Sequence, residues 1–290
     1  MTTARTDTET VVYARHDETE LSLDIFRPQH ENRHCAIALL HGGGWRAGSK
    51  EAVHPRAQAL AAQGFTAVTV QYRLLGAAPW PAQLEDAITA CVWIRDNAAA
   101  LDIDPAALVV QGHSAGAHIA LMTGTLDAEM RPAAIVAYYP AIGFHPVAPP
   151  PPPSDPSVPQ LPPLPLEIDE LGRIPGWMLF PPGTPQDELD AASPIMLLHK
   201  DFPPTVIHHA TADKLSGIHS SITLHRNLLE LGVSSELHIY ADRDHEFDRA
   251  PSMTATTVQA TTSFLERLVT RRRESEAEAQ RFGFPPADVH

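Results

Sequence analysis

A serine in a tight glycine-flanked turn is the clearest chemical feature of this chain, in Gly112-His113-Ser114-Ala115-Gly116. An apolar, β-branched run over 107–110 precedes it, and a small-residue helical pattern over 117–122 follows it. In a strand–turn–helix context the flanking positions must be small, and the serine Oγ projects from the end of the strand. The pattern therefore predicts that Ser114 is a nucleophile.

A serine hydroxyl is a poor nucleophile at neutral pH, so it needs a base, an orienting acid and donors for the developing oxyanion. Upstream of Ser114, an apolar strand pattern over 35–40 ends in the residues HGGGW at 41–45. Consecutive glycines let backbone N–H groups point together at one spot. We therefore expect an oxyanion-binding loop here, in which His41 stabilises the loop by a hydrogen bond.

The acid and the base are expected downstream, with the acid first. A strand pattern over 204–210 ends in Thr-Ala-Asp213, and a second one over 235–240 leads into a loop that contains His245. We therefore predict Asp213 as the orienting acid and His245 as the general base. Asp242, Asp244 and Asp248 lie close to His245 along the chain. Among these, Asp242 stays open as the alternative acid.

Together these motifs resemble the α/β-hydrolases of the H-G-G-G-W carboxylesterase group, which spans hormone-sensitive-lipase-like and feruloyl-esterase-like enzymes. Further matches are LDIFRP at 23–28, HGGGWRAGSK at 41–50, QYRL at 71–74, WPAQLED at 80–86 and ASP at 192–194. The resemblance covers roughly residues 10–270. It departs at Ala210, where the family usually has Gly before the acid, and over 140–191, which does not align.

The resemblance implies a single α/β-hydrolase domain over 1–290, with a mostly parallel central sheet flanked by helices. It also implies that backbone N–H groups of Gly43, Gly44 and Ala115 bind the oxyanion, and that no metal or organic cofactor is required. The implied reaction is hydrolysis of a carboxylic ester through an acyl-enzyme on Ser114. Two alternatives stay open. The first is related acyl chemistry on an amide, formamide or lactone, or a biosynthetic condensation or acyl transfer; the second is a catalytically inactive binding module.

Alternating strand and helix patterns agree with a parallel sheet that is covered on both faces. A core strand is expected over 66–72, and helices over 83–98, 220–231 and 254–268. Leu21, Leu23 and Ile25 alternate with polar residues, which predicts a half-exposed antiparallel hairpin at one edge. The segment 271–290 has helix propensity but little apolar face, so we expect an exposed tail.

A proline-rich insert over 146–185 holds about half of the 28 prolines, including an unbroken run over 149–153. Such a stretch can be a linker or a ligand for a proline-binding partner. Its place after a core strand, and its many apolar residues, favour a substrate cap over 141–191. We expect Trp177 and Phe180 of this cap to contact substrate.

Two residues beside the catalytic motifs are further candidates for substrate contact. Trp45 either walls the pocket or anchors the glycine loop. His113 occupies the variable position of the serine turn, where a side chain usually packs below the turn, and it is kept as a second candidate.

The composition of the chain limits the classes of partner that it is expected to bind. The formal net charge of −14 argues against nucleic acid and against anionic membrane surfaces. The chain shows no secretory signal and no window long enough to span a membrane, so a cytoplasmic location is expected. A small-molecule ester is the expected partner, and a homodimer is left open. Cys35 and Cys91 are expected to be buried free thiols.

Sixteen histidines raise the question of a metal site, most directly at His208 and His209 near Asp213. Adjacent residues on a strand point to opposite faces, so both cannot easily face one ion. We therefore expect structural roles for these two histidines and no metal.

Overall fold

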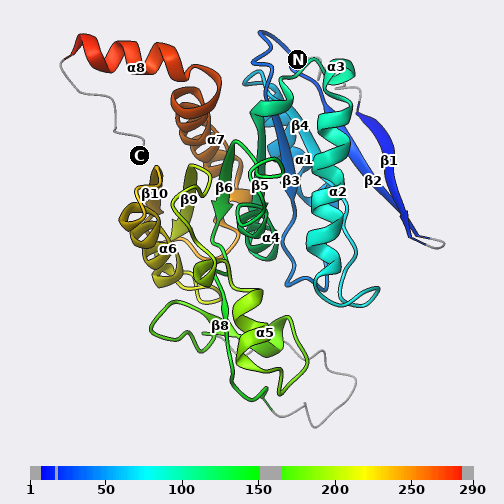
Figure 1. The fold of residues 1–290 in the computed structure, drawn as a ribbon, viewed down its shortest axis with the longest axis vertical. Helices are drawn as coiled ribbons and strands as arrows, with labels where there is room; N and C mark the ends of the chain where they lie inside the picture. Colours follow the sequence, from blue (N-terminus) through cyan, green and yellow to red (C-terminus); the bar gives the residue numbers. More distant parts are fainter. Residues whose placement is uncertain (1–7, 17–18, 151–164, 283–290) are drawn as a thin grey trace.

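One large twisted sheet forms the centre of the fold (Figure 1). The computed structural model describes residues 8–16, 19–150 and 165–282. Within them the main sheet has eight strands in the order β1-β2-β4-β3-β5-β6-β9-β10. From β4 to β10 all neighbours are parallel, whereas β1 and β2 are antiparallel. The strand bounds are β1 Glu9–His16, β2 Thr19–Phe26, β3 Ala36–Leu40, β4 Thr66–Val70, β5 Leu108–His113, β6 Ala134–Tyr138, β9 Thr205–Ala210 and β10 Ser235–Tyr240.

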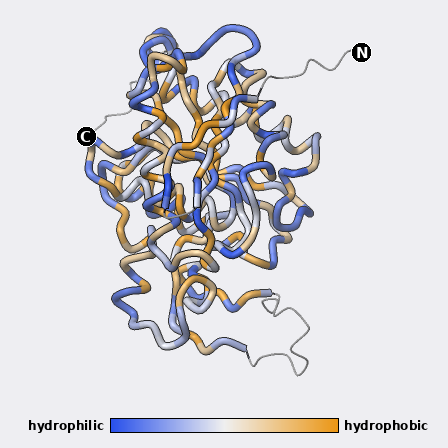
Figure 2. Tube along the Cα trace, turned by 90° about the vertical axis from the view of Figure 1, so that its right-hand side faces the viewer, coloured by the Kyte–Doolittle hydropathy of each residue, from blue (hydrophilic) through white to orange (hydrophobic). Residues whose placement is uncertain are grey.

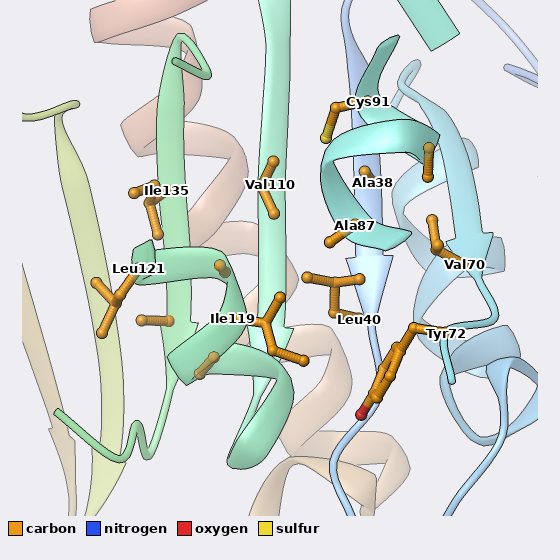
Figure 3. Packing of buried hydrophobic residues seen from close by; sticks show 14 of the residues in the cluster. Ala38, Leu40, Val70, Tyr72, Ala87, Cys91, Val110, Ile119, Leu121 and Ile135 are labelled. Atoms are coloured by element: carbon orange, nitrogen blue, oxygen red, sulfur yellow. The ribbon is translucent and has the colours of Figure 1, made fainter. Parts of the chain in front are cut away.

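Helices cover both faces of this sheet because successive strand residues point to opposite sides and both sides are apolar. On β3, Ala36, Ala38 and Leu40 pack in one cluster, whereas Ile37 and Leu39 pack in the other. Helices α2 (Ala82–Asp96), α4 (Ala115–Thr123) and α6 (Ile218–Glu230) contribute to the first cluster, part of which Figure 3 shows. Helices α1 (His54–Ala61) and α7 (Pro251–Leu265) contribute to the second. In Figure 2 the hydrophobic segments gather at the centre of the molecule.

The predicted antiparallel hairpin is present at the sheet edge, but the prediction that it is half-exposed is wrong for the second half of β2. Asp24 is only 2% exposed. It accepts hydrogen bonds from Thr10 Oγ1 (2.6 Å), pairs with His54 Nε2 (2.8 Å) and forms an ion pair with Lys50. Because α1 and the turn before it cover this face, the polar residue is buried and compensated, which a two-residue alternation cannot reveal.

Most predicted elements are present within a few residues of their expected bounds. The expected strand over 66–72 is β4, and the three expected helices are α2, α6 and α7. Cys35 and Cys91 are buried and free, as predicted. Two further helices are α3 (Ala98–Leu101) and α8 (Arg272–Arg281), and α8 has no buried residue. No helix in the described part of the chain is long and apolar enough to cross a membrane.

The insert follows β6 and lies at the carboxyl end of the sheet (Figure 1). It contains the short parallel pair β7 (Phe144–His145) and β8 (Ile174–Pro175), followed by α5 (Gln186–Ala191). Apolar side chains of the insert join the main cluster, namely Leu166, Ile174, Leu179 and Leu189. Most of the proline run, with Leu161 and Leu164, lies outside the described residues.

Candidate active site

The turn that carries Ser114 has no room for a side chain at Gly112 or Gly116. Ser114 has φ 53° and ψ −116°, between the end of β5 and the start of α4. A Cβ on Gly112 would lie 2.0 Å from the carbonyl oxygen of Gly116, and one on Gly116 would lie 2.4 Å from that of Leu40. Both glycines are therefore needed for the close approach of β5, α4 and the end of β3. A positive φ on a serine is a strained conformation of the kind that clusters at functional sites.

Three side chains that are distant in the sequence meet at this turn. Ser114 Oγ lies 3.0 Å from His245 Nε2, across 131 residues of sequence. His245 Nδ1 lies 2.7 Å from Asp213 Oδ2. Asp213 follows β9 and His245 follows β10, and these strands are parallel neighbours, so their carboxyl ends meet at the same edge of the sheet.

The carboxylate of Asp213 accepts hydrogen bonds from the residues that follow it. Its Oδ1 accepts from the backbone N–H groups of Leu215 (2.8 Å) and Ser216 (3.1 Å), and its Oδ2 accepts from Ser216 Oγ (3.1 Å). Burial by itself would raise the pKa of Asp213, but its interactions with His209 and His245 outweigh burial and hold that pKa far below the usual range. The carboxylate is therefore an anion that faces the imidazole of His245.

The other acidic residues near His245 do not face its ring. Asp242 is exposed, and among the described residues no hydrogen bond or ion pair joins its side chain to the imidazole. Asp244 Oδ1 accepts from the backbone N–H of His245 (2.8 Å). Asp248 is buried against Arg56, 2.7 Å away. The structure thus brings Asp213, and not the alternative Asp242, to the ring.

The glycine loop lies directly against the serine turn. A Cβ on Gly42 would lie 3.3 Å from Ser114 Cβ. Gly43 and Gly44 have φ of 123° and 59°, and Gly43 O accepts from the N–H groups of Arg46 and Ala47 in a tight turn. Within residues 19–150 and the other described segments, the N–H groups of Gly43 and Gly44 have no protein hydrogen-bond partner. Two backbone donors without a protein partner therefore follow Gly42, the loop residue that lies against Ser114.

A third donor belongs to the helix that follows the serine. Ala115 is the first residue of α4, and the first N–H groups of a helix have no partner within it. Helix N-termini also carry a partial positive charge, which favours an anion.

His41 contacts the glycine loop and the ring of Tyr72. Its Nδ1 lies 2.7 Å from Gly42 O, and the Tyr72 hydroxyl donates to His41 O (2.8 Å). The two rings are stacked with centroids 4.3 Å apart. Burial lowers the pKa of His41. A neutral, loop-bound ring fits the expected stabilising role.

Tyr139 and Asp248 support the loop that carries His245, and neither contact was predicted from the sequence. The Tyr139 ring packs against the imidazole with centroids 4.4 Å apart, and its hydroxyl donates to Asp248 Oδ1 (2.6 Å). Burial would raise the pKa of Asp248, but His113, Arg56 and Tyr139 together hold it well below the usual range. Arg56 is 192 residues from Asp248, and no local pattern marks the pair. The proximity of Asp248 to His245 in sequence was the only signal.

The expectation that His113 contacts substrate is wrong in this structure. Its side chain is buried, with Nε2 3.4 Å from Asp248 Oδ2 and its ring stacked on Tyr138 at 4.6 Å. It therefore packs below the serine turn, because successive residues of β5 and the turn point to opposite sides.

Trp45 is 2% exposed and packs against Phe144 at 5.7 Å and against His118 at 5.3 Å. Of its two expected roles, the structure favours anchoring of the glycine loop. The two cap candidates, Trp177 and Phe180, are half-buried. Phe180 packs on Phe144, and Trp177 lines a hollow of about 370 Å³ whose walls are mostly proline and aliphatic residues of the insert. Substrate contact by these two residues stays a prediction.

Adjacent histidines on β9 point to opposite faces, as predicted. His208 bonds to Tyr240 OH (3.0 Å) and Thr261 Oγ1 (3.1 Å), whereas His209 faces Ser221 and Asp213. Within the described residues no group of three or more histidine, cysteine or acidic side chains is arranged to hold a metal ion.

Known proteins are similar to this chain in part of its sequence or in its fold. Residues 23–141 match the BD-FAE family model. The apo form of esterase 2 from Thermogutta terrifontis superposes with a TM-score of 0.73 at 24% identity, covering 91% of this chain and 95% of that one. The carboxylesterase NlhH of Mycobacterium tuberculosis is 39% identical over 92 residues, which is 31% of this chain and 28% of NlhH. A non-reducing polyketide synthase of Stereocaulon alpinum, atr1, is 35% identical over 154 residues, 47% of this chain.

The fold is that of an α/β-hydrolase, as expected from the sequence. The chain is similar to the hormone-sensitive-lipase-like and feruloyl-esterase-like proteins of this fold, which confirms the predicted resemblance. It spans only 6% of the length of atr1 and 28% of NlhH.

Proposed function

We propose that this chain hydrolyses carboxylic esters through a Ser114–His245–Asp213 triad. The observation that carries the proposal is the line of contacts from Ser114 Oγ to His245 Nε2 (3.0 Å) and from His245 Nδ1 to Asp213 Oδ2 (2.7 Å). Nucleophile, base and orienting acid at hydrogen-bond distance are the arrangement that activates a serine.

In the first half-reaction Ser114 Oγ attacks the acyl carbon while His245 Nε2 takes the hydroxyl proton. Asp213 holds the Nδ1–H tautomer and stabilises the imidazolium as it forms. The N–H groups of Gly43, Gly44 and Ala115 bind the oxyanion of the tetrahedral intermediate. When that intermediate collapses, the bond to the alcohol breaks and His245 gives the alcohol its proton.

In the second half-reaction a water molecule attacks the acyl-enzyme. His245 removes a proton from the water, a second tetrahedral oxyanion forms in the same site, and its collapse returns the proton to Ser114 Oγ. The products are a carboxylic acid and an alcohol.

The similarity to the carboxylesterase NlhH and to Thermogutta terrifontis esterase 2 supports esters as the substrate class. We further propose that the insert over 141–191 is a cap that excludes water from the reacting groups. Its apolar residues Leu166, Leu179 and Leu189 pack against the body of the domain. A cytoplasmic location and a homodimer stay predictions.

A second candidate function is acyl transfer to an acceptor other than water. The similarity to the polyketide synthase atr1 favours it, because that name describes synthesis rather than hydrolysis. Both reactions share the acyl-enzyme and differ only in what attacks it. The ratio of hydrolysis to transfer product, measured with added alcohol and thiol acceptors, separates the two.

A panel of chromogenic esters of increasing acyl length, beside N-formyl-aryl and lactone substrates, tests the main proposal. Wild type should release acid from the esters, and Ser114→Ala should lose activity by roughly a million-fold. Thermal unfolding of Ser114→Ala should match wild type. A variant that keeps a tenth of wild-type activity would remove Ser114 from the mechanism, and a wild type that processes nothing in the panel would favour a binding module.

A further inference from the structure

A second histidine reaches the carboxylate of Asp213. His209 on β9 has its Nε2 3.2 Å from Asp213 Oδ2, the same oxygen that faces His245 Nδ1. On its other side, His209 Nδ1 lies 2.6 Å from Ser221 Oγ on α6. His209 and Ser221 are both fully buried, with 0% exposure. A line of contacts therefore runs from Ser221 through His209 to Asp213 and on to His245.

The surroundings of His209 select one tautomer. Its Nε2 is buried, lies off the line of an ideal hydrogen bond to Oδ2, and has no other partner among the described residues. A lone pair on Nε2 would face a carboxylate anion and be repelled, whereas an N–H there is attracted. Nδ1 then accepts a hydrogen bond from the Ser221 hydroxyl. Burial lowers the pKa of His209 although Asp213 opposes it, which agrees with a neutral ring.

We propose that His209, held by Ser221, is a positioning residue that shares Asp213 Oδ2 with the catalytic imidazole. The inference rests on the proposed function, because it assigns His209 a part in the same triad. His209 limits how much of the carboxylate charge is available to His245, and it fixes the direction from which Oδ2 meets Nδ1.

Loss of the His209 N–H has two consequences. The carboxylate then presents more negative charge to His245, which stabilises the imidazolium that forms during the reaction. The carboxylate is also less firmly oriented, which slows the acylation step. KM should change little, since His209 and Ser221 are buried behind Asp213.

The other charged or titratable groups around His245 stay the same in this comparison. They are Asp244, which accepts its backbone N–H, and Tyr139, whose ring packs on the imidazole and whose hydroxyl is bonded to Asp248. A shift in the pH profile is therefore attributable to the Asp213 side of the ring.

The test compares His209→Phe with His209→Gln. Phe keeps a planar ring of similar size without a donor. Gln places its amide Nε2 the same number of bonds from the backbone as the lost nitrogen, so it can restore the N–H. The matched control is His208→Phe, next to it on β9, which loses bonds to Tyr240 and Thr261 on the opposite face.

Two readouts are measured from pH 5 to 9, the kcat and KM of ester hydrolysis and the rate at which a fluorophosphonate labels Ser114. In the labelling reaction the Oγ–P bond forms, fluoride leaves and His245 takes the hydroxyl proton. His209→Phe should slow both reactions roughly tenfold, because it removes the N–H that attracts and orients the Asp213 carboxylate. For this variant, the midpoint of the acid limb of the pH–rate profile should rise by roughly half a pH unit or more.

His209→Gln should recover most of the rate and the wild-type midpoint. Ser221→Ala, a smaller change, should move both quantities in the same direction as His209→Phe but less. His208→Phe should lower the unfolding temperature and leave the midpoint where it is. A His209→Phe midpoint equal to that of wild type, or a Gln variant no better than Phe, overturns the inference.

Failure of the proposed function gives a different pattern. If wild type hydrolyses no ester but Ser114 is labelled, ester hydrolysis is wrong, and the labelling profiles still decide the role of His209. If Ser114 of wild type is neither labelled nor acylated, the triad is not functional and the inference falls with it.

Discussion

Arg56 on α1 and Asp248, three residues beyond His245, form an ion pair of 2.7 Å in which both side chains are 4% exposed. Arg56 also donates to the Tyr138 hydroxyl (2.7 Å), and Asp248 accepts from Tyr139, whose ring packs on His245. The pair therefore connects a helix on one face of the sheet with the loop that carries the proposed base. It is a structural support of the site that is remote from the reacting atoms.

Arg56→Met should destabilise the fold by about 3–5 kcal/mol, because it leaves the Asp248 carboxylate buried without its cation. Urea unfolding followed by circular dichroism measures this change. Arg56→Met combined with Asp248→Asn should recover part of the loss, since no unpaired charge then remains. Arg15→Ala is the control, because the Arg15–Glu20 pair is 70% and 55% exposed and should contribute less than about 1 kcal/mol. An Arg56→Met variant as stable as wild type would contradict the importance of the pair.

Asp213→Asn should reduce kcat by roughly 10⁴-fold, because an amide favours the wrong tautomer of the His245 ring. Asp242→Asn should have little effect, since Asp242 is exposed and the imidazole is hydrogen-bonded to Asp213 instead. Steady-state kinetics on one activated ester compares the two variants directly. A large loss of kcat in Asp242→Asn, together with a nearly wild-type kcat in Asp213→Asn, would reverse the assignment of the acid.

Gly43→Ala and Gly44→Ala should differ in severity. A Cβ on Gly43 would lie 2.1 Å from Ala47 O, so the loop must shift and the oxyanion donors move with it. A Cβ on Gly44 meets nothing within 4 Å, and its φ of 59° is in the left-handed region that alanine tolerates at a cost. We expect Gly43→Ala to lose roughly 10²-fold or more in kcat, with a smaller change in KM. Gly44→Ala should lose less. Equal kcat in wild type and Gly43→Ala would show that this loop does not bind the oxyanion.

Trp177→Ala tests the insert as a cap. Trp177 lines the hollow of the insert, whose lining includes no residue of the triad or of the glycine loop. We expect this hollow to hold a bulky substrate group that extends away from Ser114. Truncation of Trp177 should then raise KM severalfold for bulky esters and leave small activated acetates unaffected. Leu171→Ser is the control, since Leu171 belongs to the same insert but is 41% exposed and does not line the hollow. If both variants match wild type across the ester panel, the hollow lined by Trp177 is not part of the substrate pocket.

Local motifs allowed much of the site to be predicted from the sequence. The serine turn requires small residues at Gly112 and Gly116 because of contacts at 2.0 and 2.4 Å, and such requirements are visible as residue types at fixed spacing. The strands were predictable because a buried parallel strand is a short apolar run. The order of serine, acid and base along the chain then indicated Asp213 and His245.

Tertiary structure alone decided which side chains support these residues. Arg56 meets Asp248 across 192 residues, and His209 faces Asp213 because the chain turns at Thr211 and Ala212, directly after β9. Asp24 is buried although its strand alternates like an exposed edge, because α1 covers that face. Sequence periodicity reports which face of an element is apolar. It carries no information on which distant element covers that face, and this determines the charge and hydrogen-bond partners of each buried polar group.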